Sequence, residues 1–130
     1  HCDEIDSDVE TALQRLRKTN IDKKTQTVLL KDINDHPQTL INLFYKLLDL
    51  DFTPYYLHHP DKVKGGMHFF LPLEKGREIY SKLRKYLPGW ALPHYVIDNA
   101  QGEGKQLAFN PESIKYSGKL LNINGKLSNY

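Results

Sequence analysis

Cysteine is almost absent from this chain of 130 residues, and the single one, Cys2, lies at its amino terminus. One cysteine excludes a disulfide within the chain and cannot by itself hold a structural zinc ion or an iron–sulfur cluster. No apolar run approaches the roughly 20 residues that cross a bilayer, so we expect no membrane segment. The scarcity of cysteine favours a reducing, cytoplasmic environment.

No single sign of charge dominates the sequence. Lysine and arginine together number 18, aspartate and glutamate number 16, and the formal net charge is +2. The basic residues stand among acidic or aromatic ones rather than in one patch, so the charge does not predict a nucleic-acid partner. The chain also has no initiator methionine and no secretory signal at its start, which leads us to expect a further segment upstream.

Helix and strand patterns alternate along the chain. Three helices are predicted by apolar residues at helical spacing, over about 8–19, 37–50 and 74–87. Three strands are predicted by short β-branched or aromatic runs, over 25–30, 52–58 and 90–98. This alternation is typical of an α/β fold with a parallel sheet, whose functional residues usually follow the strands. Three strands do not close a barrel, so we expect a missing half or a partner to cover the sheet edges.

Local sequence features give finer expectations. Ser7 is expected to cap the first helix and Asp35 the second, because each stands where a helical pattern begins. The run 25–30 is expected to be a buried strand, because its residues are mostly β-branched or apolar. Pro93 interrupts the last strand pattern and indicates an edge or irregular position. Asn124-Gly125, near the carboxyl end, predicts a β hairpin.

Lys105 follows a turn that contains Gly102 and Gly104. Glycines let the backbone approach a ligand closely and direct successive amides at an anion such as a phosphate. A lysine that reacts with an aldehyde cofactor must spend time unprotonated, and a tight loop beside a strand end can supply the desolvation. A solvated lysine in a polar turn is the simpler interpretation, and the residues alone leave both open. A P-loop is excluded, because Asn99 and Gln106 replace residues that this motif requires.

Two aspartates follow aromatic strand patterns in similar places, Asp61 after the second strand and Asp98 after the third. In parallel strands both carboxylates lie at the same rim of the sheet, where they are able to grip a cationic amine. Aspartate is also a favoured turn residue, so turn formation is the competing interpretation. His58, His59 and His68 surround Asp61, but their spacing fits no zinc motif and we predict no metal site.

Aromatic and amide side chains in the strands also have two interpretations. Tyr55, Tyr56 and Phe69-Phe70 are expected in the core, which is commoner for aromatic residues than stacking on a cofactor. Gln26 stands among apolar neighbours in a strand pattern, so its burial would require a polar partner. Either the backbone or a ligand is able to provide that partner.

A series of motifs, in order along the chain, resembles lysine 2,3-aminomutase, a radical S-adenosylmethionine family. Each motif is weak by itself, but the ordered series is specific and spans most of residues 1–110. The motifs are Thr25-Gln26-Thr27-Val28-Leu29-Leu30, Asn34-Asp35, Pro54-Tyr55-Tyr56-Leu57, Asp61, Gly66, His68-Phe69, Gly89-Trp90-Ala91-Leu92-Pro93, Asp98 and Gly102-x-Gly104-Lys105. The resemblance implies the carboxy-terminal portion of a radical S-adenosylmethionine partial (β/α) barrel over 1–110. It implies a short β extension, a hairpin or tail, over 111–130.

The resemblance also implies roles for individual residues. Lys105 matches the lysine that binds pyridoxal phosphate covalently, with Gly102 and Gly104 beside the cofactor. Asp61 and Asp98 match the pair that binds the side-chain ammonium of the substrate, L-lysine. These assignments come from the family and select one of the interpretations that the residues alone leave open.

The activity implied by the resemblance is an isomerase reaction, a radical shift of the 2-amino group of L-lysine to C3. Gln26 falls where the family contacts S-adenosylmethionine, which is cleaved at a four-iron four-sulfur cluster to start the reaction. Cys2 is the only cysteine, so we expect the cluster ligands in a missing amino-terminal half of the barrel. That half is the expected partner, and a homo-oligomer is a further one.

The same residues allow other functions. The stretch 57–63 with Gly65-Gly66 is closer to the branch that isomerises lysine for attachment to elongation factor P. Asp98 lies seven residues before Lys105, which matches the free-lysine enzymes instead. A non-catalytic fragment that uses the same surface for assembly is the second hypothesis, and a generic α/β binding module is the third. The start, His1-Cys2-Asp3, departs from the His-Pro-Asn that is usual in the family.

Overall fold

The computed structural model describes residues 1–98, 104–109, 119–121 and 127–129. Its helices are η1 (Cys2–Glu4), α1 (Ser7–Arg17), α2 (Pro37–Asp49), η2 (Met67–Phe69), α3 (Leu73–Tyr86) and η3 (Gly89–Ala91). Its strands are β1 (Lys24–Val28), β2 (Thr53–His58), β3 (His94–Asp98), β4 (Lys105–Leu107), β5 (Lys119–Leu121) and β6 (Leu127–Asn129). The three predicted helices are confirmed to within two residues at each end. Within the described ranges, no helix has the length and apolar character needed to cross a membrane.

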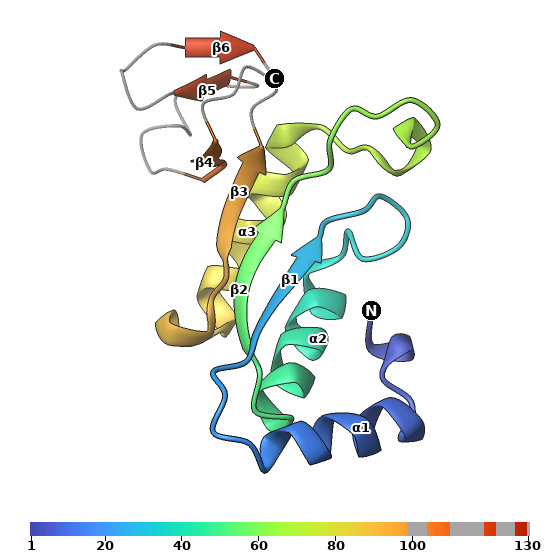
Figure 1. Ribbon diagram of the computed structural model, residues 1–130. Helices are drawn as coiled ribbons and strands as arrows, with labels where there is room; N and C mark the ends of the chain where they lie inside the picture. Colours follow the sequence, from blue (N-terminus) through green and yellow to red (C-terminus); the bar gives the residue numbers. More distant parts are fainter. Residues whose placement is uncertain (99–103, 110–118, 122–126, 130) are drawn as a thin grey trace.

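Four strands form one mixed sheet in the order β1-β2-β3-β4 (Figure 1). The first three run parallel, and β4 returns antiparallel to β3. The predicted α/β fold with parallel strands is therefore confirmed. The sequence does not predict β4, because three residues are too few to show an alternating pattern. β5 and β6 form a separate antiparallel pair, and the Asn124-Gly125 turn expected between them lies outside the described residues.

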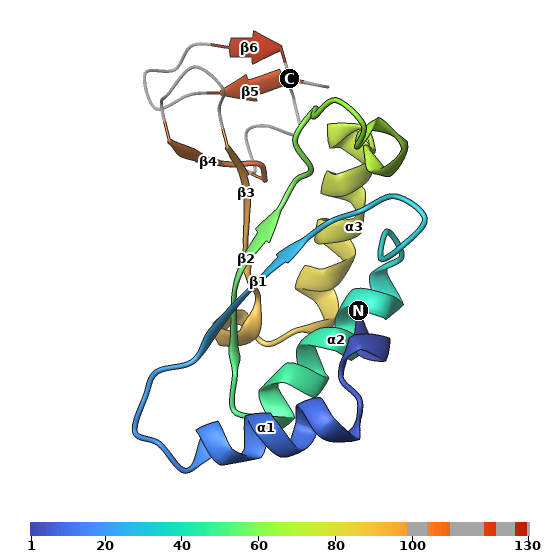
Figure 2. The same cartoon turned by 45° about the vertical axis from the view of Figure 1, so that its right-hand side comes forward.

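Helices α2 and α3 pack on one face of the sheet (Figure 2). The core lies between them and the strands, and α1 is attached at one end through an ion pair between Glu10 and Lys46. The buried side chains at its centre are Leu29, Leu40, Phe44, Leu57, Leu83, Tyr95 and Ile97. The opposite face of the sheet is open in both views and carries exposed polar and aromatic side chains. Side chains on this open face are therefore accessible to a ligand.

The helix starts differ from the predicted caps by one residue each. Asp6, not Ser7, caps α1, because its carboxylate accepts hydrogen bonds from two amides of the first turn. His36, not Asp35, caps α2, with its Nδ1 accepting the first-turn amide hydrogen bond. A residue before proline is pushed to an extended backbone, which is the conformation of an N-cap, and Pro37 occupies the first helical position. Both cap predictions are therefore wrong.

Two strand predictions also need correction. Strand β1 is not buried, because it lies at the edge of the sheet and its residues alternate between exposed and half-buried. Val28 is 45% exposed at its end. Strand β3 is not an edge strand, since it lies between β2 and β4. The alternative expectation, an irregular chain around Pro93, is confirmed, because β3 begins only at His94, after η3. Pro93 is compatible with this interior position because it precedes the strand, where it removes no ladder hydrogen bond.

Candidate functional site

A row of four polar side chains crosses the open face of the sheet, and each of the four strands contributes one. We call Gln26 of β1, His58 of β2, Asp98 of β3 and Lys105 of β4 the polar row. His58 Nε2 lies 2.9 Å from Gln26 Oε1, and His58 Nδ1 lies 3.3 Å from Asp98 Oδ2. Lys105 Nζ donates a hydrogen bond of 2.7 Å to Asp98 Oδ1. Residues far apart in sequence are thus joined side chain to side chain.

Lys105 opens β4 rather than lying within the preceding turn. Gly104, just before it, has φ +74°, a conformation that favours glycine and turns the chain into the strand. The Lys105 side chain is 39% exposed, and its ammonium lies 5.9 Å from the centre of the Tyr56 ring. Gly102 lies outside the described residues. The lysine is therefore accessible from the open face.

Asp98 dominates the electrostatics of Lys105. The hydrogen bond to Asp98 raises the pKa of the Lys105 amine, and the charge of the same carboxylate adds to this effect. Conversely, the hydrogen bond from Lys105 lowers the pKa of Asp98. The residues alone leave open whether Lys105 is a desolvated, easily deprotonated amine or a solvated lysine in a polar turn. The structure holds it as an ammonium ion paired with a carboxylate. Lys105 must lose this proton before its amine can act as a nucleophile.

Asp98 and Asp61 both follow parallel strands, as predicted. Asp98 ends β3, and Asp61 lies in the exposed loop after β2. The structure brings Asp98 into direct contact with Lys105. Asp61 acts on Lys105 more weakly, since its charge is the last of the contributions that raise the pKa of this amine. Of the two carboxylates, Asp98 therefore has the stronger effect on Lys105.

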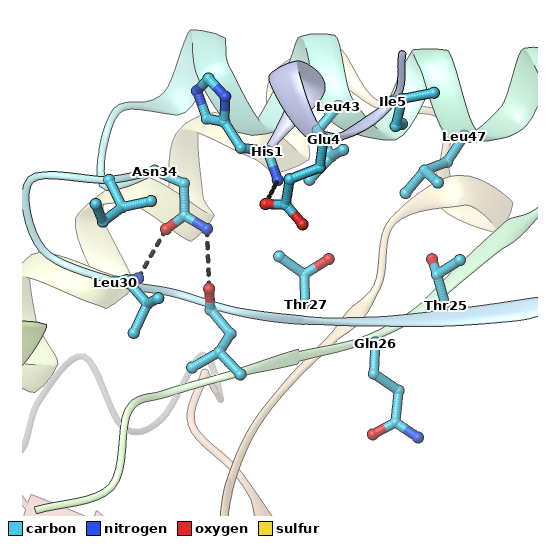
Figure 3. A pocket seen from close by; sticks show the side chains of 12 residues that line it. His1, Glu4, Ile5, Thr25, Gln26, Thr27, Leu30, Asn34, Leu43 and Leu47 are labelled. Atoms are coloured by element: carbon cyan, nitrogen blue, oxygen red, sulfur yellow. Dashed lines mark hydrogen bonds and ion pairs between the residues drawn. The ribbon is translucent and has the colours of Figure 1, made fainter. Parts of the chain in front are cut away.

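Gln26 is exposed rather than buried, because β1 is an edge strand whose outer face is open. Figure 3 shows its side chain on the opposite side of β1 from Thr25 and Thr27, which face α2. Its polar partner is the imidazole of His58, and neither the backbone nor a ligand is needed to explain its place. Gln26 thereby becomes one end of the polar row.

A β-bulge explains why two adjacent tyrosines share the open face. The register of β1 against β2 passes from Thr25–Pro54 to Gln26–Tyr56, so Tyr55 has no partner on β1. The two tyrosine rings lie 4.3 Å apart between centroids with their planes tilted by 52°, and Tyr55 is 36% exposed. Their prediction as core residues is therefore wrong. An extra residue in one strand cannot be detected from the spacing of apolar residues.

The histidines do not converge on one point. His58 belongs to the polar row, whereas His59 is buried on the helix side and bonds the Tyr95 hydroxyl at 2.6 Å. His68 is exposed and lies against the ring of Phe69. The part of the chain that the structure describes contains no group of three histidine, cysteine, aspartate or glutamate side chains suited to a metal ion.

His58 and Tyr56 are the functional candidates that sequence reasoning missed. From the sequence, His58 is considered only as a metal ligand, with no metal site predicted, and Tyr56 is expected in the core. Alternation along Tyr56-Leu57-His58 was the available indication, since a buried Leu57 places both neighbours on the other face of the sheet. Because the bulge adds Tyr55 as an extra residue, the alternation does not extend to the first residues of β2.

A cavity of about 330 Å³ lies at the edge of the sheet, between the amino-terminal η1, β1 and α2 (Figure 3). Asn34 organises its wall, because its Nδ2 donates to Val28 O at 2.9 Å and its Oδ1 accepts from Leu30 N at 2.7 Å. Apolar side chains such as Leu43 and Leu47 form the floor. Gln26 of the polar row is among the residues that line this cavity, whereas Lys105 and Asp98 are not.

The sequence has relatives among known proteins. The sequence matches no protein-family model. It is 39% identical over 93 residues, 72% of the chain, to L-lysine 2,3-aminomutase of Escherichia coli K12. It is 31% identical over 123 residues, 92% of the chain, to the Bacillus subtilis protein of that name, and 39% identical over 105 residues to that of Methanococcus maripaludis. The chain is related to the lysine 2,3-aminomutases.

This relationship covers most of the chain but only part of its relatives. The matched region makes up 27% of the Escherichia coli aminomutase, 26% of the Bacillus subtilis one and 24% of the Methanococcus maripaludis one. The chain thus spans about a quarter of the length of these aminomutases. The match to the Bacillus subtilis aminomutase covers 92% of the chain, so it leaves out too few residues at the ends of the chain to exclude Lys105. The polar row therefore lies in the region that the two proteins share.

Proposed function

We propose that this chain is the part of a lysine 2,3-aminomutase that binds pyridoxal phosphate and the substrate amine. The proposed reaction moves the 2-amino group of L-lysine to C3. The observation that carries the proposal is the Lys105–Asp98 pair on the open face, within a region related to the aminomutases. An accessible lysine next to a carboxylate is a suitable arrangement for holding an aldehyde cofactor beside a cationic substrate.

Lys105 fits covalent attachment of pyridoxal phosphate. Its amine is accessible on the open face, and its proton is able to leave to solvent, because the side chain is 39% exposed. Tyr56 lies under the ammonium and offers a ring surface beside it. Gly102 and Gly104 are proposed to line the cofactor, and the positive φ of Gly104 supports a close backbone approach there.

Gln26 fits a contact with S-adenosylmethionine, because its amide lies exposed on the same face as Lys105. When bound, pyridoxal phosphate would hold the migrating nitrogen, and S-adenosylmethionine would supply the radical that removes a substrate hydrogen. A four-iron four-sulfur cluster does not fit this chain, since Cys2 is its only cysteine. We therefore assign the cluster to a further part of the protein.

Asp98 and Asp61 are proposed to bind the side-chain ammonium of L-lysine. Asp98 already holds an ammonium group, that of Lys105, with a distance and geometry that a substrate ammonium would use. Hydrogen bonds to charged groups contribute about 1.5 to 3 kcal/mol each, which is enough to select an amine-tailed substrate over a neutral one. Lys105 occupies this position only while its amine stays protonated and unbound.

The uncovered edge of β1 supports a further part of the protein beside this chain. The strand is parallel to β2 and, among the described strands, has only that one neighbour. We propose that the amino-terminal half of a partial (β/α) barrel continues the sheet at this edge. Such a half would also cover the cavity beside Asn34.

A chimeric enzyme tests this function. The chain would replace the matching segment of the Bacillus subtilis aminomutase, to which 92% of the chain aligns. We expect the chimera to convert L-lysine to β-lysine, and we expect Lys105→Ala to abolish the conversion because the cofactor loses its attachment. Lys82→Ala, which changes an exposed lysine of α3, is the matched control. A chimera that folds and binds its cofactors but forms no β-lysine would contradict the proposal.

A further inference from the structure

His58 lies in the polar row between Gln26 and Asp98. Its side chain is less exposed than those of Asp98 and Lys105, at 15% against 42% and 39%. The sequence motifs give this residue no role. A shielded side chain between exposed ones suggests that it orients its neighbours rather than meeting a ligand itself.

Contacts on three sides fix the imidazole of His58. Nδ1 faces Asp98 Oδ2 at 3.3 Å, and Nε2 faces Gln26 Oε1 at 2.9 Å. The ring also packs edge-on against Tyr56, with centroids 5.5 Å apart. Because turning the ring would break at least one of these contacts, its orientation is set by the strands β1, β2 and β3 together.

The two oxygens of the Asp98 carboxylate have different partners. Oδ2 accepts from His58, and Oδ1 accepts from Lys105. A carboxylate with one oxygen anchored presents the other in a fixed direction, which is how an outer hydrogen bond orients a group that binds a ligand. Without the anchor, Asp98 at the exposed end of β3 would rotate between several solvated conformers.

We propose that His58 is a positioning residue that holds Asp98 toward the amine at Lys105 and links it to Gln26. The inference rests on the proposed function, which assigns Asp98 to the substrate amine and Lys105 to the cofactor. It adds that the Gln26 side and the substrate side of the site are held as one hydrogen-bonded unit across the sheet. Among the described residues, the titratable groups that act on Lys105 are Asp98, Tyr56 and Asp61, with His58 beyond Asp98.

The test measures how fast borohydride fixes pyridoxal phosphate on Lys105 of the full chain as a function of pH. His58→Phe keeps a ring of similar shape against Tyr56 but removes both nitrogens. Asp98 then no longer holds the Lys105 ammonium firmly, so the neutral amine becomes more populated. We expect fixation at neutral pH to be about threefold to tenfold faster, the factor expected for one weakened hydrogen bond of a charged group, and the pH profile to move to lower pH.

Two substitutions at His58 separate positioning from a purely structural role. His58→Asn keeps an N–H near the place of Nδ1 and should match the parent profile, whereas His58→Gln keeps one near Nε2 and should behave like His58→Phe. His94→Phe is the matched control, because His94 lies on the same face against Tyr55 and belongs to no part of the polar row. If His58→Phe does not fold, the contrast between Asn and Gln decides, and equal profiles for these two would overturn the proposal.

The outcomes distinguish this inference from the proposed function. If the parent chain does not fix the cofactor on Lys105, the proposed function fails. If the parent does so and His58→Phe has the same profile, or one moved to higher pH, only the positioning role is overturned. In an Asp98→Asn background, His58→Phe should produce no further acceleration, because the group that it positions no longer carries a charge. Independent, additive effects of the two substitutions would contradict the proposal.

Discussion

Asp98→Asn is expected to speed the fixation of pyridoxal phosphate on Lys105 several-fold at neutral pH. In the parent chain, the hydrogen bond and charge of Asp98 raise the pKa of the Lys105 amine and keep it protonated. A neutral amide removes the charge, so the pKa of Lys105 falls and the fraction of neutral amine rises at every pH below it. The rate profile, followed by borohydride trapping and mass spectrometry, should therefore move to lower pH.

The same substitution is expected to weaken substrate binding. In the chimeric enzyme, the KM for L-lysine should rise by about 10- to 100-fold, which corresponds to the loss of one hydrogen bond between charged groups. Asp61→Asn is the control for the trapping profile, because Asp61 is the weakest contributor to the pKa of Lys105 and its effect should be smaller. A trapping profile that stays in place in Asp98→Asn, or moves to higher pH, would show that the Lys105–Asp98 pair does not govern the amine.

Gly76→Ala is expected to destabilise the fold by about 3 kcal/mol, although alanine favours helices. Gly76 is buried on the face of α3 that packs against β3. A Cβ at this position would overlap the hydroxyl oxygen of Tyr95 and lie 3.1 Å from His59 Nδ1. These two groups bond each other at 2.6 Å, so relief of the overlap would break a buried hydrogen bond. Urea unfolding of the parent and the variant measures the difference.

Two further variants test this explanation. In Tyr95→Phe the obstructing hydroxyl is absent, so adding Gly76→Ala to it should cost less than adding Gly76→Ala to the parent. Gly89→Ala is the matched control, because a Cβ there meets nothing within 4 Å, and its effect should stay within about 0.5 kcal/mol. Equal costs of Gly76→Ala in both backgrounds would disprove that the Tyr95 hydroxyl is the obstacle.

The helices could be predicted from sequence because their apolar residues repeat at helical spacing, as at Leu40, Leu43 and Leu47. Their exact starts could not, because two adjacent residues were each able to cap, and the backbone before Pro37 decided between them. The placement of Asp61 and Asp98 after parallel strands could also be predicted, because the alternation of helix and strand patterns indicated a parallel sheet. Sequence thus predicts where the candidate site lies more readily than how its side chains meet.

The contacts within the site depend on features that leave no periodic trace. Lys105 reaches Asp98 because the chain returns as the short antiparallel strand β4, which no pattern indicates. Gln26 meets His58 across two strands whose register contains a bulge at Tyr55. A resemblance assigns separate roles to Lys105, Asp98 and Gln26, but only the fold shows that His58 contacts both Asp98 and Gln26.

Attachment of pyridoxal phosphate to Lys105 is tested by mapping which lysines the cofactor modifies. The 130-residue chain is mixed with pyridoxal phosphate, reduced with borohydride and digested, and the modified lysines are mapped by mass spectrometry, with Lys105→Ala as the control. Selective modification of Lys105 that disappears in the variant is the predicted result. Modification spread over surface lysines such as Lys75 and Lys82, unchanged in Lys105→Ala, would contradict the claim.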